Sequence, residues 1–227
     1  MDFVLPPPVP CALPVAHSTA YFPIHRVFCI GRNYRWLPDE PAPTDMPAWF
    51  MKPATAVELA SDTLPYPPGT DAFCHEVELV VAIGRGGRDI DPRDASDHIW
   101  GYAAGLDMTR RDLQLQAKQN GGPWEPAKAF DHSAPCSAIV PATHCGHPRE
   151  GVIHLSVNGV ERQRADLADL LWSVPELVAM LSRSVSLLPG DLIFTGTPTG
   201  VAPLEPGDVI HAGVAGIGEI TLTVTRA

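Results

Sequence analysis

Proline and glycine are the residues that most constrain how this chain can fold. The sequence has 25 prolines and 19 glycines among its 227 residues, spread over its whole length. Proline interrupts helices and glycine supports tight turns, so few stretches can form a long helix. The composition therefore predicts a fold of many short strands joined by turns. The length suits one domain with a sizeable core.

Local patterns add detail to this expectation. Asn158-Gly159, flanked by two β-prone segments, predicts a two-residue hairpin over 152–164. Apolar residues recur at helical spacing from Leu167 to Leu181, which predicts one amphipathic helix. Together the patterns predict a mixed, mainly antiparallel β structure. Shorter helices are expected over 94–100 and 110–119, and further strands over 27–30, 49–51, 73–84, 192–195, 209–212 and 217–224.

The N-terminal residues 1–20 differ from the remainder of the chain. They are rich in proline and weakly patterned, and they lack the positively charged start of a signal peptide. We expect them to form an extended arm, laid over the domain or over a partner subunit. Residues 21–227 are expected to form the single domain.

Charge and cysteine content narrow the classes of partner. The formal net charge is −10, the pI is near 5.2, and no basic stripe is present. These features argue against a nucleic acid or an anionic membrane as partner. No apolar run reaches membrane-spanning length. The five cysteines are odd in number and include no Cys-x-x-Cys pair, which argues against a zinc ribbon and predicts a reducing, cytoplasmic location. The expected partner is a small molecule.

Two carboxylates share one face of the strand predicted over 73–84. Side chains alternate faces along a strand, so Glu76 and Glu78 project to the same side. Adjacent like charges repel each other unless a cation or a proton lies between them. A bound metal ion would remove that repulsion, and the simpler alternative is a solvated face on which both carboxylates meet water. The opposite face carries only apolar residues, namely Val77, Leu79, Val81 and Ile83.

Asp107 ends a second apolar run, which begins at Gly101 and leads into a predicted helix. Functional side chains concentrate where strands end in loops, so this carboxylate could join Glu76 and Glu78 in a three-oxygen site. No Cys or His accompanies them at a suitable spacing. Carboxylate ligands favour a hard cation, with Mg²⁺ first and Mn²⁺ or Ca²⁺ next.

Six segments follow one another in an order and spacing typical of one protein family. They are Cys29–Tyr34, Phe50–Pro53, His75–Ile83, Gly101–Gln114, Lys128–Asp131 and Pro189–Pro198. Over residues 27–227 this pattern resembles the fumarylacetoacetate hydrolase superfamily. Further motifs make the chain most similar to the short bacterial fumarylpyruvate hydrolases, and these are Thr109–Gln114, Gly122–Trp124 and Val157–Gln163.

The resemblance implies a fold, a site and an activity. The implied fold is a β-roll of sheets with short peripheral helices, and the implied assembly is a homodimer. The implied activity is metal-dependent hydrolysis of a carbon–carbon bond in an acylpyruvate, such as fumarylpyruvate, during the breakdown of aromatic compounds. The implied metal ligands are Glu76, Glu78 and Asp107, the active-site lysine is Lys128, and the substrate-binding residues are Tyr34, Arg111, Gln114, Gly196 and Thr197.

The chain departs from this family in the segment after Tyr34. The hydrolases continue their Gly-x-Asn-Tyr motif with two residues and then His-Ala-x-Glu, and the His and Glu pair activates the attacking water. Glu40 is retained here and is the expected catalytic base, but Leu37 stands in place of the His. Pro38 would also interrupt a helix at this point.

This departure leaves three classes of function open. The first is the acylpyruvate hydrolase. The second is a tautomerase, isomerase or decarboxylase acting on a keto acid such as oxaloacetate, because proton movement or loss of CO₂ needs an enolate but no attacking water. The third is a binding protein that keeps the metal and the ligand without turnover.

Overall fold

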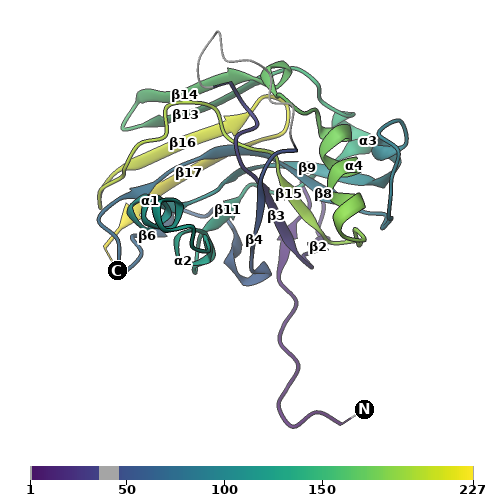
Figure 1. The fold of residues 1–227 in the computed structure, drawn as a ribbon, viewed down its shortest axis with the longest axis horizontal. Helices are drawn as coiled ribbons and strands as arrows, with labels where there is room; N and C mark the ends of the chain where they lie inside the picture. Colours follow the sequence, from purple (N-terminus) through teal and green to yellow (C-terminus); the bar gives the residue numbers. More distant parts are fainter. Residues whose placement is uncertain (1, 36–45, 227) are drawn as a thin grey trace.

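Two β-sheets form the body of the protein within residues 2–35 and 46–226, which are the residues that this computed structural model describes (Figure 1). The larger sheet has the order β4 (Trp49–Lys52), β3 (Val27–Ile30), β15 (Leu192–Phe194), β8 (Val77–Ile83), β9 (Ile99–Leu106), β11 (Ala134–Cys136) and β5 (Val57–Leu59), and β12 (Val140–Pro141) also pairs with β9. The smaller sheet has the order β14 (Val160–Asp166), β13 (Val152–Val157), β16 (Val209–Val214), β17 (Gly218–Thr225) and β6 (Thr63–Pro65).

Two strand pairs and several short helices complete the structure. The pairs are β1 (Ala12–Pro14) with β2 (Tyr21–Pro23), and β7 (Phe73–Cys74) with β10 (Thr109–Arg110). The α-helices are α1 (Arg111–Asn120), α2 (Glu125–Lys128), α3 (Ala142–Cys145) and α4 (Val174–Ser184). The 3₁₀ helices are η1 (Ala54–Ala56), η2 (Ala95–His98) and η3 (Leu167–Asp169). The predicted mainly β fold with short peripheral helices is confirmed, and none of the described helices has the length and apolar character needed to span a membrane.

Strand β8 is buried on both faces. Val77 and Leu79 belong to the core that the two sheets share, whereas Val80 and Ala82 belong to a second core with residues of β1, β2 and β3. Each buried Val or Leu side chain contributes about 1.5–3 kcal/mol through its burial. Glu78 therefore lies inside the protein, and the expectation of a solvated strand face is wrong for this residue.

The predicted strand over 73–84 is interrupted. Its residues form β7 and β8, with His75 and Glu76 between them, and the opposing chain is interrupted in the same place between β9 and β10. The Asp107 N–H donates a hydrogen bond to the Glu76 carbonyl at 2.8 Å across this gap. The interruption brings the polar residues of two neighbouring strands to one place.

The amphipathic helix predicted over 167–181 is wrong in its first half. Residues 167–169 form η3, and α4 begins only at Val174. Ser173 and Glu176 form a capping box and Pro175 occupies the first turn, so the local sequence favours a helix start there. The Leu171 N–H donates to the Asn33 carbonyl, which holds the intervening segment away from helical geometry.

The predicted hairpin is confirmed. Strands β13 and β14 pair across Asn158 and Gly159, which have φ values of 53° and 76°. Positive φ at both positions is what a type I′ turn requires.

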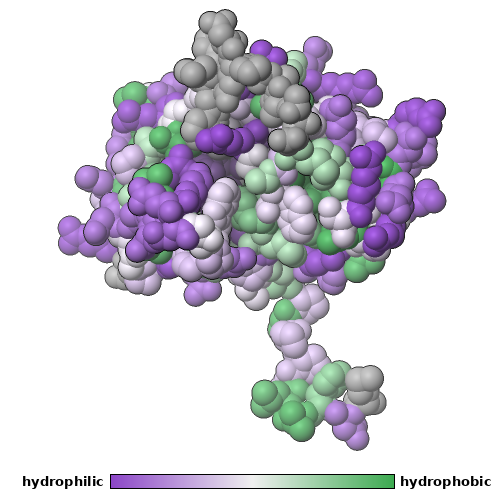
Figure 2. Space-filling model, viewed as in Figure 1, coloured by the Kyte–Doolittle hydropathy of each residue, from purple (hydrophilic) through white to green (hydrophobic). Residues whose placement is uncertain are grey.

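Part of the expected N-terminal arm pairs with the domain. Strand β1 lies within residues 1–20, and its Leu13 is fully buried in the second core. The preceding residues extend away from the body (Figure 1). Phe3, Val4, Leu5 and Val9 expose their apolar side chains on this arm (Figure 2).

Candidate active site

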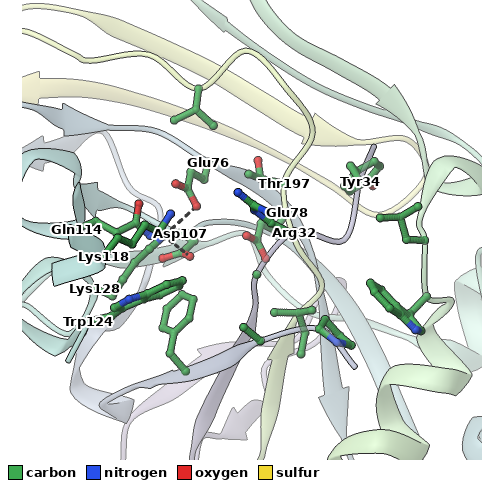
Figure 3. A pocket seen from close by; sticks show the side chains of 18 of the residues that line it. Arg32, Tyr34, Glu76, Glu78, Asp107, Gln114, Lys118, Trp124, Lys128 and Thr197 are labelled. Carbon is green, nitrogen blue, oxygen red and sulfur yellow. Dashed lines mark hydrogen bonds and ion pairs between the residues drawn. The ribbon is translucent and has the colours of Figure 1, made fainter. Parts of the chain in front are cut away.

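A cavity of about 420 Å³ opens beside the interruption between β7 and β8. Figure 3 shows the carboxylates of the site together, with Gln114, Lys118, Trp124 and Lys128 on one side and Tyr34 on the other. The structure thus brings together residues that lie far apart in sequence. The predicted site residues that line the cavity are Tyr34, Glu76, Glu78, Asp107, Arg111, Gln114, Lys128 and Thr197.

The three carboxylates predicted to bind a metal form one buried cluster. Glu76, Glu78 and Asp107 each offer an oxygen, and these oxygens lie within 4.8 Å of one another. The pKa of Glu78 is raised well above its usual range. Burial is the largest cause, and the negative charges of Asp107 and Glu76 add to it. The cluster thus concentrates negative charge that a cation would stabilise.

Two buried lysines offset part of this negative charge. Lys128 Nζ lies 2.8 Å from Glu76 Oε2 and 2.7 Å from Asp107 Oδ2. Lys52 Nζ lies 2.9 Å from Asp107 Oδ1, and it also donates to the carbonyls of Met108 and Lys128. Burial alone would raise the pKa of Asp107, but Lys128 and Lys52 lower it. Asp107 is therefore an ionised carboxylate held between two ammonium groups.

Lys128 is held as a permanent cation. Its Nζ also donates to Thr109 Oγ1 at 2.5 Å, so all three of its N–H groups have acceptors. Burial opposes the charged form, yet Asp107 and Glu76 raise the pKa of Lys128 far above its ordinary value. Lys128 can therefore supply charge to the cavity but is a poor proton acceptor.

Glycine is required at Gly196, which has a φ of 102°. A Cβ there would also approach Asn33 Cβ to 2.7 Å. The Gly196 N–H donates to Glu78 Oε2 at 2.7 Å, so it positions a member of the carboxylate cluster. Its expected role in binding the substrate stays a prediction.

Thr197 is fixed by a buried amide that the sequence analysis did not select. Gln163 Nε2 donates to Thr197 Oγ1 at 2.9 Å and to the Pro198 carbonyl at 2.8 Å. Its Oε1 accepts from the Val77 N–H at 3.2 Å and from His75 Nδ1 at 2.9 Å. Thr197 Oγ1 in turn donates to the Val77 carbonyl. The amide of Gln163 thus joins the hairpin, the carboxylate strand and the loop at Thr197.

Arg111 and Gln114 lie together on the first turn of α1. Arg111 Nη1 donates to Gln114 Oε1 at 2.6 Å and approaches Glu76 Oε1 at 3.3 Å. The preceding residue, Arg110, points elsewhere, and its guanidinium carbon lies 4.4 Å from the Phe130 ring centroid. Arg111 and Gln114 therefore present one cation and one amide at the cavity wall.

Asn33 and Tyr34 come just before the segment in which this chain departs from the family pattern, and both are buried. Asn33 donates to the Thr195 carbonyl and accepts from the Trp172 N–H, both at 2.8 Å. Tyr34 beside it is buried, and its hydroxyl has no hydrogen-bond partner among the described residues. Glu40, the predicted base, and Leu37 lie outside the described residues.

Comparison with known proteins supports the family resemblance. The chain is 47% identical over 180 residues to a fumarylpyruvate hydrolase of Ralstonia sp, covering 79% of this chain and 93% of that protein. It is 40% identical over 190 residues to an oxaloacetate tautomerase of Escherichia coli, covering 82% and 87% of the two chains.

A solved structure extends the comparison to three dimensions. Fumarylpyruvate hydrolase from Pseudomonas aeruginosa, in complex with Mn²⁺ and pyruvate, is 44% identical to this chain, and each chain is fully covered. The TM-score of the two structures is 0.96. Residues 26–225 match the family described as fumarylacetoacetate (FAA) hydrolase C-terminal, and the protein belongs to this family.

Proposed function

We propose that this protein hydrolyses a carbon–carbon bond in an acylpyruvate, a 2,4-diketo acid such as fumarylpyruvate. Water adds to the carbonyl distal to the pyruvate unit, and the bond from that carbonyl to the neighbouring methylene breaks. The acyl group leaves as a carboxylic acid, and the pyruvate enolate takes up a proton. The observation that carries this proposal is the buried carboxylate cluster beside a permanent cation in the cavity wall.

The donor set fits a hard divalent cation. The cluster supplies three carboxylates, and within residues 2–35 and 46–226 no Cys or His belongs to it. Glu76, Glu78 and Asp107 would hold the ion, with Mg²⁺ proposed first and Mn²⁺ or Ca²⁺ next. When bound, such an ion supplies Lewis acidity to the oxygens of a keto acid.

Lys128 contributes fixed positive charge. As the carbon–carbon bond breaks, negative charge develops on the pyruvate fragment, and a buried ammonium nearby lowers the energy of that charge. Because its three N–H groups are already directed by neighbouring oxygens, Lys128 needs no reorientation during the reaction. Its role in this proposal is electrostatic.

Arg111, Gln114 and Thr197 are proposed to orient the substrate. Arg111 and Gln114 can donate to carboxylate or carbonyl oxygens, and Thr197 offers a hydroxyl from the opposite loop. Tyr34 adds an apolar ring at the far side of the cavity. Glu40 is proposed as the base that activates water, although Leu37 replaces its usual imidazole partner.

Tautomerisation of a keto acid such as oxaloacetate is the second candidate, and decarboxylation of such an acid belongs to the same class. Leu37 favours this class, because neither reaction needs an activated water. The similarity to an oxaloacetate tautomerase of Escherichia coli supports it as well.

Product analysis separates these candidates. The protein, supplied with Mg²⁺ or Mn²⁺, is mixed with fumarylpyruvate and followed by proton NMR. Hydrolysis should release fumarate and pyruvate in equal amounts. A change in the ultraviolet spectrum of oxaloacetate or fumarylpyruvate without cleavage would support the tautomerase instead. Ligand binding with no change in either substrate would indicate a binding protein.

We also propose that the protein is a homodimer. The exposed apolar side chains of Phe3, Val4, Leu5 and Val9 would be removed from water if the arm packed against a second copy. Two-fold pairs are the commonest soluble assemblies. Light scattering at micromolar concentration should give the dimer mass, and deletion of residues 1–10 should lower it. A monomer mass for the full chain would contradict this proposal.

The cytoplasmic location stays a prediction from the cysteine pattern.

A further inference from the structure

Lys118 lies at the cavity wall, and none of the described residues supplies it with a carboxylate partner. It follows Gln114 by four residues on α1, so both side chains face the cavity. Its Nζ lies 5.0 Å from the ring centroid of Trp124. Among the described residues, no Asp or Glu comes within ion-pair distance of this ammonium group. Figure 3 shows Lys118 on the same side of the cavity as Gln114 and Trp124.

The surroundings of Lys118 are positively charged. Arg32 and Arg111 also line this cavity, and Arg111 is already engaged by Glu76 and Gln114. The pKa of Lys118 is lowered. Partial burial is the largest cause, and the positive charges of Arg111 and Arg32 add to it. Cations held near one another are stabilised by an anion between or beside them. This part of the cavity is therefore suited to a negatively charged group.

An aromatic wall joins Lys118 to the carboxylate cluster. The ring centroids of Trp124 and Phe50 lie 5.7 Å apart, and Lys128 Nζ lies 5.1 Å from the Phe50 centroid. The order along the wall is thus Lys128, Phe50, Trp124 and Lys118. Flat aromatic surfaces favour a planar, unsaturated chain lying along them. The two ends of this wall each carry an ammonium group.

We propose that Lys118 is a specificity-determining residue that binds a second carboxylate at the far end of the acyl group. The protein would then prefer acylpyruvates that end in a carboxylate over neutral ones. This inference rests on the proposed function. It adds that the acyl group carries its own charge and lies along Phe50 and Trp124, with its pyruvate unit at the carboxylate cluster.

The test compares two substrates that differ in the distal carboxylate. Fumarylpyruvate has this group and acetylpyruvate lacks it. Lys118→Met should lower kcat/KM for fumarylpyruvate about 10- to 100-fold, because a charge-assisted hydrogen bond is lost, and should leave acetylpyruvate within about twofold. Lys118→Arg should retain most of the preference. Gln119→Met, an exposed position on the same helix, is the matched control.

The outcomes separate this inference from the proposed function. Equal losses on both substrates, or no loss on either, would overturn the role of Lys118 while leaving hydrolysis intact. If the parent cleaves neither substrate, the proposed function fails. The role of Lys118 in binding a carboxylate is then tested by the binding of fumarate alone. Calorimetry with the Mn²⁺-loaded full chain should show weaker fumarate binding by Lys118→Met than by the parent. Equal binding would contradict the inference.

Discussion

The two ends of the cavity differ in how firmly their charged groups are held. At the inner end, Glu78, Asp107 and Lys128 are at most 2% exposed, and each is fixed by hydrogen bonds or ion pairs. At the outer end, Lys118 is exposed and contacts the ring of Trp124. The two ends of the cavity therefore suit different tasks. The rigid inner end suits chemistry on the keto acid, and the open outer end suits selection of the acyl group.

The largest expected effect comes from the inner end. Glu78→Ala removes one of three anionic ligands and should abolish both cation binding and turnover. Metal titration by calorimetry and release of pyruvate are the measurements. Glu219→Ala, on a largely exposed carboxylate of β17, is the control and should behave as the parent. Unchanged turnover by Glu78→Ala would place the site elsewhere.

The second effect concerns which reaction occurs. Glu40→Gln should depress hydrolysis by about 10² to 10⁴, the usual worth of general base catalysis, and leave oxaloacetate tautomerisation largely intact. Leu37→His should raise hydrolysis by less than this, since a proline directly after the new His restricts the backbone there.

Both activities are measured on both variants. If neither substitution changes cleavage while substrate binding persists, Glu40 is not the base. The assignment of the segment after Tyr34 would then be wrong.

The third effect compares stability at the two ends. Gln163→Leu removes an amide that makes four hydrogen bonds, and it leaves the buried Val77 N–H and His75 Nδ1 without their acceptor. The expected loss is about 1–3 kcal/mol, which lowers the Tm by several degrees. Lys118→Met should leave the Tm within about a degree of the parent. Calorimetric melting of both variants measures the two changes in Tm. Equal changes in Tm would contradict the expected difference between Gln163→Leu and Lys118→Met.

The smallest effect is a pH-dependent change in stability. Burial, followed by the charges of Asp107 and Glu76, raises the pKa of Glu78 on folding. Its ionisation therefore costs stability above the unfolded pKa, and this cost grows until the pH passes the folded pKa. In the presence of a chelator at about pH 8, Glu78→Gln should melt a few degrees above the parent. The difference in Tm between Glu78→Gln and the parent should disappear as the pH falls toward about 4. A difference in Tm that does not change with pH would contradict this prediction.

The sequence predicted those parts of the site that follow from strand periodicity. Alternation along the strand placed Glu76 and Glu78 on one side, and the end of an apolar run marked Asp107. The sequence did not show that β8 is covered on both faces, because burial depends on which elements pack against a strand.

Residues outside any periodic pattern were harder to predict. Lys52 and Lys118 look like surface lysines, since their roles depend on Asp107 and on Trp124, which lie elsewhere in the chain. A charged residue between an apolar strand and a proline was the available signal for Lys52. The helix start at Val174 was visible as Ser173-Val-Pro-Glu176, yet the apolar spacing from Leu167 onward suggested a longer helix.

The buried lysines also bear on how the protein acquires and loses its cation. In many small metalloproteins the ligands repel one another until the ion arrives, so folding and metal binding are a single event. Here Lys52 and Lys128 neutralise much of the charge on Glu76 and Asp107 within the fold itself. The ligand set can therefore persist while ions exchange. Turnover would then rise and fall with the free concentration of divalent cation, at the speed of ligand exchange rather than of refolding.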